Sequence, residues 1–277
     1  MNDLSQIRSL LFAPGNDAHK LERAATSGAG AVIADLEDSV PPGEKESARR
    51  VVERALRTRS AENVWMVRTN ALESGLLEAD VAALTDAEPD VLVLPKATPE
   101  AIECLRPEGP PIVAIVETAV GVREAHAIGA AARVLALALG AVDLSLRLRL
   151  RPLPGGKELL FARSKLVVDS AAAGIRPPFD AVYLDVRDER GLKDEAELAR
   201  GLGFGGKMCI HPRQIGIVES VWAPSRAEIE WAQRVLAAHE EALATGRGAV
   251  ALEGRLIDHP VVEQAREVLA ASRKEEA

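Results

Sequence analysis

The chain has 277 residues, of which 47% are hydrophobic and only 3% aromatic, and its formal net charge is −8. Such a chain can bury one large, mainly aliphatic core. The negative charge argues against nucleic acid as the main partner. No apolar run approaches the ~20 residues of a membrane span. Cys104 and Cys209 make neither a disulfide framework nor a CxxC metal pair, so we expect a cytoplasmic protein.

Short aliphatic segments alternate with helix-like segments along the chain. Eight aliphatic segments predict strands, at residues 9–14, 31–35, 64–68, 91–96, 112–117, 134–140, 181–185 and 207–211. Continuous Val/Ile/Leu runs are typical of strands buried on both faces, as in parallel sheets. The main helical segments lie at 17–28, 43–57, 98–106, 156–174, 194–203, 225–243 and 261–274.

This alternation predicts the α/β class and a TIM (β/α)8 barrel with a C-terminal helical extension. The barrel is expected to occupy residues 1–245. Residues 246–277, a loop and a last helix, exceed what a closed barrel needs. A doubly wound open sheet is the alternative architecture, but nothing in the chain resembles its glycine-rich phosphate motif.

Charged side chains follow most of the predicted strands, where a barrel carries its chemistry. In chain order they are Asp35, Glu37, Asp38, Arg68, Lys96, Glu117, Asp143, Asp185 and His211. Glu117 and Asp143 follow neighbouring strands, so the two carboxylates could hold one Mg²⁺, which takes one or two protein carboxylates. The alternative for this pair is ordinary capping or salt-bridged acids.

Arg68 has two interpretations that can hold together. Its guanidinium could bind a substrate carboxylate through two parallel hydrogen bonds, or it could form a buried ion pair with the acids that follow the second strand. For Lys96 we favour a structural role, neutralising the same acids. His211 precedes a proline, and a hydrogen-bonded structural group is the expected role.

Residues 144–151 alternate leucine with serine or arginine. An extended segment would place the leucines on one side and the arginines on the other. We expect a surface ribbon whose leucines pack on the barrel rim. The alternative is that Arg147, Arg149 and Arg151 line the site and bind phosphates or a second carboxylate.

Seven motifs in order resemble one family. They are "RSLLFAPGNDAHKLERA", "AVIADLEDSVPPGEKESARR", "VRTNA", "VLPKA", "IVETAVGV", "GFGGKMCIHPRQI" and "LIDHPVVEQARE". They resemble the citrate lyase β-subunit family, which groups with the malyl-CoA and citramalyl-CoA lyases in the HpcH/HpaI aldolase superfamily. The resemblance runs from about Arg8 to the last helix.

The resemblance implies a TIM barrel in homotrimers or larger homo-oligomers, with Mg²⁺ held by Glu117 and Asp143. Arg68 would bind the carboxylate of a keto-acid product, and Asp258 would reach a neighbouring subunit's site as acid/base, with residues 246–277 packing on that subunit. Coenzyme A, as part of the substrate, would lie near Asn16 and Lys20. The substrate-binding residues implied are Arg68, Glu117, Gly140, Ala141 and Asp143.

The chain departs from the family after the sixth strand. The usual pattern there is "G-x-E-D-x-x-x-D-L-G", whereas this chain has "GAVDLSLRLRLRP". Asp143 is kept, but Val142 stands where glutamate is expected and the second acidic motif is absent. Loss of that glutamate could weaken Mg²⁺ binding or change the substrate.

Three functions remain open from the sequence. The first is a Mg²⁺-dependent carbon–carbon lyase that cleaves or forms a 3-hydroxyacyl-CoA thioester of the malyl, citramalyl or citryl type, with a 2-keto acid and an acyl-CoA as the other partners. The second is a CoA-independent, Mg²⁺-dependent aldolase acting on pyruvate or oxaloacetate adducts. The third is a non-catalytic metabolite-binding subunit.

Overall fold

The computed structural model describes residues 4–61, 63–105, 107–244, 246 and 248–273. The last positions of two predicted helices, 106 and 274, lie outside the described residues. A few positions of the two predicted domains also lie outside them. Within it, no helix combines the length and the apolar character needed to cross a membrane.

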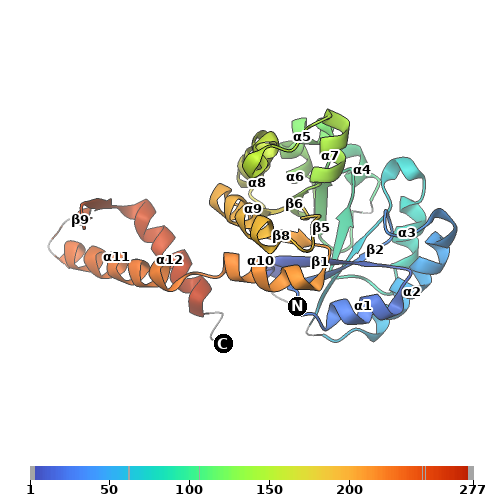
Figure 1. The fold of residues 1–277 in the computed structure, drawn as a ribbon, viewed down its shortest axis with the longest axis horizontal. Coiled ribbons are helices and arrows are strands. Elements are labelled where there is room, and N and C mark those ends of the chain that lie inside the picture. Colours follow the sequence, from blue (N-terminus) through green and yellow to red (C-terminus); the bar gives the residue numbers. More distant parts are fainter. Residues whose placement is uncertain (1–3, 62, 106, 245, 247, 274–277) are drawn as a thin grey trace. The chain divides into compact units, whose positions relative to one another are not determined.

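Eight parallel strands close into a barrel in sequence order, as the sequence predicted (Figure 1). Closure is made by β8 and β1, where Ser9 pairs with Lys207 and Leu11 with Cys209. The strands are β1 Ser9–Pro14, β2 Ala31–Asp35, β3 Val64–Arg68, β4 Val91–Leu94, β5 Ile112–Val116, β6 Val134–Leu139, β7 Arg176–Asp180 and β8 Gly206–Cys209.

Helices connect these strands and cover the outside of the barrel (Figure 1). The α-helices of this part are α1 Ala18–Ala25, α2 Lys45–Thr58, α3 Leu77–Ala83, α4 Pro99–Glu103, α5 Ala119–Arg123, α6 Ala125–Gly129, α7 Ala141–Leu148, α8 Leu160–Ala172, α9 Glu189–Leu202 and α10 Ile215–Trp222. Short 3-10 turns are η1 Leu4–Gln6, η2 Pro42–Glu44, η3 Leu72–Ser74, η4 Pro154–Leu159 and η5 Pro212–Gln214.

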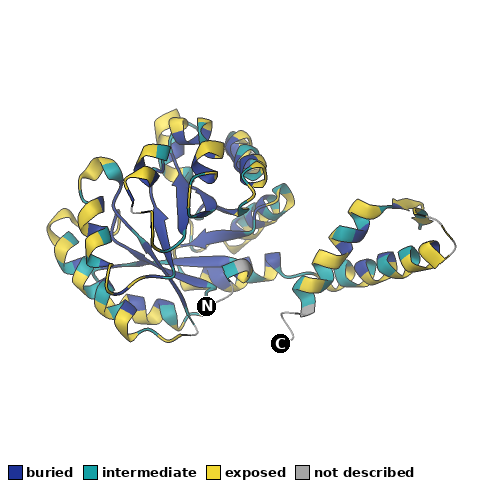
Figure 2. Cartoon of the chain, turned by 180° about the vertical axis from the view of Figure 1, so that it is seen from behind, coloured by how far each residue is buried: buried dark blue, intermediate teal, exposed yellow. Residues whose placement is uncertain are grey.

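The strands are buried on both faces, and the helices expose only their outer sides (Figure 2). Side chains from alternate strand positions fill the barrel interior, among them Leu10, Ile33, Met66, Val93 and Ile115. Burial on both faces accounts for the continuous aliphatic runs in the sequence. The filled interior also leaves the strand ends as the place where a ligand can bind.

The seventh strand differs from its prediction. It covers Arg176–Asp180, whereas the sequence placed it at 181–185. The true strand contains Pro177 and Pro178, which donate no backbone hydrogen bond, and its pairing with β6 is irregular there. Asp180 fixes the strand from its end, because this fully buried carboxylate accepts hydrogen bonds from Arg163 (2.8 Å) and Lys207 (2.7 Å).

The leucine–arginine segment also differs from its prediction. Most of this segment belongs to the helix α7 rather than to an extended ribbon. The helix is followed by Arg149, which has a positive φ of 56°. In a helix, alternate residues spread around the axis instead of sharing a face. Accordingly Leu144 is buried while Leu146 is 76% exposed.

The chain divides into two compact units, Met1–Glu219 and Ser220–Ala277. The second contains α11 Arg226–Ala244, a hairpin of β9 Val250–Leu252 and β10 Arg255–Ile257, and α12 His259–Arg273. It has its own core, in which residues of α11 such as Val235 pack with residues of α12 such as Val262. The structure therefore places the division earlier than position 245, because α11 joins the C-terminal unit.

Candidate active site

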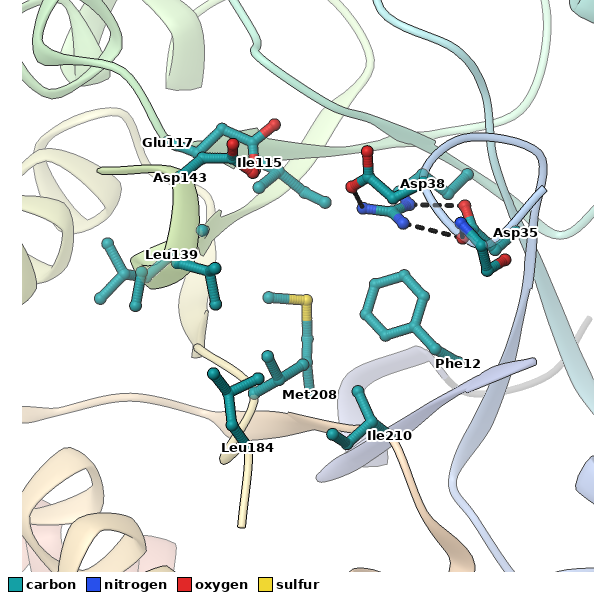
Figure 3. A pocket seen from close by; sticks show the side chains of 16 residues that line it. Phe12, Asp35, Asp38, Ile115, Glu117, Leu139, Asp143, Leu184, Met208 and Ile210 are labelled. Carbon is teal, nitrogen blue, oxygen red and sulfur yellow. Dashed lines mark hydrogen bonds and ion pairs between the residues drawn. The ribbon is translucent and has the colours of Figure 1, made fainter. Parts of the chain in front are cut away.

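A pocket of about 380 Å³ opens where the barrel strands end. It brings together the residues that the sequence predicted for substrate binding, namely Arg68, Glu117, Gly140, Ala141 and Asp143. Figure 3 shows the carboxylates of Glu117 and Asp143 side by side, with Asp35 and Asp38 across the pocket from them. This is the end at which TIM barrels carry their active sites.

Glu117 follows β5 and is held in a buried position, with 4% of its surface exposed. Its Oε1 accepts a hydrogen bond from the backbone N–H of Lys96, with an N···O distance of 2.8 Å. Lys96 has a φ of 47°, which is uncommon for a residue with a Cβ. Burial, together with the negative charges of Glu37 and Asp143, raises the pKa of Glu117 from 4.5 to about 7.

Gly140 allows Glu117 and Asp143 to meet. It lies between β6 and α7, and a Cβ at this position would be 2.9 Å from Cγ2 of Ile115 and closer still to the side chain of Glu117. Only glycine leaves this space free. Asp143 then lies in the first turn of α7, where the helix dipole favours a negative charge.

Arg68 ends β3 and forms the buried ion pair that was one of its two predicted roles. Its Nε and Nη2 donate to the two carboxylate oxygens of Asp35, at 2.6 and 2.8 Å. Nη1 lies 3.1 Å from Glu37 and 3.3 Å from Asp38. The guanidinium also stacks over the ring of Phe12, 4.9 Å from its centroid. Burial favours a higher pKa for Asp35, but Arg68 outweighs it and lowers that pKa.

Glu37 connects Arg68 to Lys96, whose Nζ donates to Glu37 Oε1 at 2.6 Å. Burial raises the pKa of Glu37 more than these two cations lower it. The site as a whole has more negative than positive groups. Five carboxylates, of Asp35, Glu37, Asp38, Glu117 and Asp143, share it with three cations, Arg68, Lys96 and Lys45, whose Nζ donates to the backbone carbonyls of Leu36 and Glu37. An added cation would therefore stabilise the site.

The donors suit a hard divalent ion. Within the described ranges, no group of three or more His, Cys, Asp or Glu side chains surrounds one point. The two carboxylates of Glu117 and Asp143 match the way Mg²⁺ binds, with one or two protein carboxylates and the remaining positions left to water and substrate oxygens. The raised pKa of Glu117 indicates that its negative charge is not balanced by the cations of the site, so a bound metal ion would stabilise the carboxylate.

Asn16 and Lys20 do not line the barrel pocket. Asn16 Nδ2 donates to Glu44 at 2.6 Å, and Lys20 forms an exposed ion pair with Asp17 at 3.3 Å. Lys20 does line another cavity, of about 260 Å³, which is formed by β1, α1 and the residues that follow β8. His211 lines the same cavity and, as expected, has a structural contact: its Nδ1 accepts the backbone N–H of Arg213.

Asp258 belongs to the C-terminal unit, where it directly precedes α12. Its carbonyl oxygen accepts the N–H of Val262 at 3.0 Å, and its side chain lies 3.5 Å from the N–H of Val261. Its predicted role at a neighbouring subunit's site stays a prediction.

One residue that the sequence placed at the end of a strand lies elsewhere. Three arginines that were an alternative set of site residues lie outside the pocket. Asp185 is exposed and accepts the N–H of Arg187, and Asp180 ends the seventh strand instead. The exposed Arg147, Arg149 and Arg151 do not line the pocket.

The link from Glu37 through Lys96 to Glu117 was not predicted as a unit. The three residues are far apart in the chain. The only sequence signal for their contact is that each of them follows a predicted strand.

Comparisons with known proteins identify the family of this chain. The family model of the HpcH/HpaI aldolase/citrate lyase matches residues 8–212. The citrate lyase subunit beta of Leuconostoc mesenteroides subsp. cremoris is 37% identical over 97% of this chain and 94% of its own length. A (3S)-malyl-CoA thioesterase of Cereibacter sphaeroides is 36% identical over 95% of this chain and 93% of its own.

The fold has a close counterpart among solved structures. The protein CitE from Mycobacterium tuberculosis, in complex with magnesium, acetoacetate and coenzyme A, superposes with a TM-score of 0.85 at 33% identity, covering 98% of this chain and 100% of that one. The resemblance seen in the sequence motifs, and the lyase class that it implied, are thereby confirmed. This chain belongs to the HpcH/HpaI aldolase/citrate lyase family.

Proposed function

We propose that the protein is a Mg²⁺-dependent carbon–carbon lyase that cleaves or forms a 3-hydroxyacyl-CoA thioester, with a 2-keto acid and an acyl-CoA as the other partners. The observation that carries this proposal is the charge balance of the barrel pocket. Five carboxylates against three cations would repel an anionic substrate, and the paired Glu117 and Asp143 offer the oxygen donors for a divalent ion that reverses this repulsion.

Glu117 and Asp143 would hold Mg²⁺, which supplies Lewis-acid stabilisation of negative charge that develops on keto-acid oxygens. Lys96 positions Glu117 through its backbone N–H. Gly140 keeps the space that Glu117 occupies. These contacts fix the donors before substrate binds, which avoids reorganisation during the reaction.

Arg68 would bind the keto-acid carboxylate. Asp35 occupies Nε and one hydrogen of Nη2, so the hydrogens not bonded to Asp35 lie on Nη1 and on the outer side of Nη2. Nη1 now faces Glu37 and the exposed Asp38, and a substrate carboxylate would compete with Asp38 for it. The bidentate pair with Asp35 orients the guanidinium for this contact.

The proton would be moved by Asp258 of a neighbouring subunit, and the phosphates of coenzyme A would bind near Asn16 and Lys20. The cavity that contains Lys20 also holds Arg23, so two cations are available there for phosphate oxygens.

A lyase assay tests the proposal. Protein with Mg²⁺ is given malyl-, citramalyl- and citryl-CoA, and products are measured by mass spectrometry. Cleavage should disappear in Glu117→Ala and persist in Glu103→Ala, an exposed acid outside the pocket. Turnover of keto-acid adducts without CoA would indicate the aldolase instead. Absence of turnover, together with absence of both Mg²⁺ and CoA binding, would indicate a non-catalytic subunit.

Complementation tests the shared site. Asp143→Asn and Asp258→Asn are each expected to be inactive. If the site combines one subunit's Asp143 with another's Asp258, random co-assembly of the two variants should restore about a quarter of the wild-type activity. No recovery in verified mixed oligomers would contradict the role of the neighbouring subunit.

A further inference from the structure

The barrel pocket has two chemically different sides (Figure 3). One side carries the carboxylates and Arg68. The other side, here called the apolar wall, consists of Phe12, Leu184, Met208 and Ile210. Phe12 comes from β1, Met208 from β8, Leu184 from the loop after β7 and Ile210 from the loop after β8. Figure 3 shows Leu184, Met208, Ile210 and Phe12 together on the side away from Glu117 and Asp143.

The apolar wall presents hydrocarbon to the ligand rather than to the protein interior. Leu184 is 62% exposed, and Ile210 is also exposed. Val142, which is also exposed, adds an uncharged aliphatic group to the pocket lining beside Asp143. Exposed aliphatic groups at a pocket rim gain stability when a ligand removes them from water.

The apolar wall also lacks a partner for a negative charge. Among the pocket-lining residues that the structure describes, Arg68 is the only cation. Its Nε edge is occupied by Asp35, and its face by Phe12. Nη1 contacts Glu37 and the exposed Asp38, so one substrate carboxylate can bind there in exchange for Asp38. A second carboxylate would meet Leu184, Met208 and Ile210 without a hydrogen-bond donor, which is costly.

We propose that the barrel pocket selects a substrate with a single free carboxylate and an alkyl substituent next to the reacting carbonyl, in preference to one with two free carboxylates. This inference rests on the lyase function proposed above and specifies its substrate. The carboxylate binds at Arg68, and the alkyl group lies on the apolar wall. In terms of the keto acid, pyruvate and longer alkyl analogues are favoured over oxaloacetate.

Equilibrium binding tests this selectivity without requiring turnover. Calorimetric titration of the Mg²⁺-loaded protein uses glyoxylate, pyruvate and 2-oxobutyrate, and then the matched pair oxaloacetate and 4-methyl-2-oxopentanoate. In this pair a carboxylate replaces an isopropyl group of similar shape. The Kd should fall about two- to fourfold for each added carbon. Oxaloacetate should bind at least about tenfold more weakly than its matched analogue.

A variant locates the effect. Leu184→Lys supplies a cation on the apolar wall at an exposed position and should improve oxaloacetate relative to its matched analogue by about tenfold. Leu243→Lys, at a leucine of α11 that is 56% exposed and outside the pocket lining, is the matched control and should leave the ratio unchanged.

Three results would contradict the inference. Tightest binding of oxaloacetate by the wild type would overturn the selectivity and leave the lyase function standing. An unchanged ratio in Leu184→Lys would overturn the placement of the substituent on the apolar wall. Failure of all five keto acids to bind in the presence of Mg²⁺ would overturn the lyase function itself.

Discussion

Replacing Glu117 by glutamine should stabilise the metal-free protein at alkaline pH. The buried carboxylate is deprotonated only with difficulty, because burial and the charges of Glu37 and Asp143 raise its pKa to about 7. A glutamine keeps the Oε1 that accepts the N–H of Lys96 but carries no charge. The wild type therefore carries an unfavourable charge above pH 7 that the variant lacks.

The size of this effect follows from linkage between protonation and folding. The folded-state pKa is raised above the unfolded value, so the contribution to stability is fully present below pH 4.5 and is lost as the pH rises through about 7. The difference between 4.5 and about 7 corresponds to about 3 kcal/mol of unfolding free energy. Because Glu117 is 4% exposed, solvent screening reduces this figure little.

Urea unfolding with a chelator, from pH 4.5 to 8.5, measures the difference between the two proteins. Glu117→Gln should be more stable than the wild type at pH 8 by up to about 3 kcal/mol, and the advantage should disappear near pH 4.5. Mg²⁺ should stabilise the wild type at pH 8 and affect the variant much less. Glu103→Gln, at an exposed position, is the control. A difference that does not change with pH would refute the reasoning.

Three further substitutions test other contacts of the site. Gly140→Ala should displace the side chain of Glu117 and weaken Mg²⁺ affinity at least about tenfold, with a stability loss of about 1–3 kcal/mol; unchanged calorimetric Mg²⁺ binding would count against it. Asp38→Asn removes an exposed competitor for the substrate carboxylate, so KM should fall about two- to fivefold with little change in kcat; a raised KM would argue that Asp38 assists binding. Lys96→Met breaks the half-buried pair with Glu37 and should cost about 2 kcal/mol in urea unfolding; wild-type stability would show that the pair contributes nothing.

The barrel could be predicted because burial on both faces leaves a clear trace in the sequence. Seven of the eight predicted aliphatic segments overlap the strands β1–β6 and β8. The seventh strand left no such trace, since its sequence, RPPFD, reads as a turn. What fixes it is the buried contact of Asp180 with Arg163 and Lys207, and a pattern within one segment cannot reveal contacts between distant segments.

The site was predictable to the extent that its residues follow strands. Arg68, Glu117 and Asp143 were found because strand ends converge on one rim. The reason for Gly140 could not be found in the same way, because it depends on how closely β6 approaches the side chain of Glu117. The helix α7 was missed because its alternation of leucine and arginine is typical of an extended segment.

The excess of carboxylates in the pocket makes Mg²⁺ and substrate interdependent ligands. If bound metal lowers the repulsion that an anionic keto acid meets, then by thermodynamic reciprocity bound keto acid must tighten the metal by the same factor. Magnesium affinity measured on the protein alone would then understate the affinity during turnover. Activity would respond steeply to free Mg²⁺ when substrate is scarce and much less when substrate is abundant.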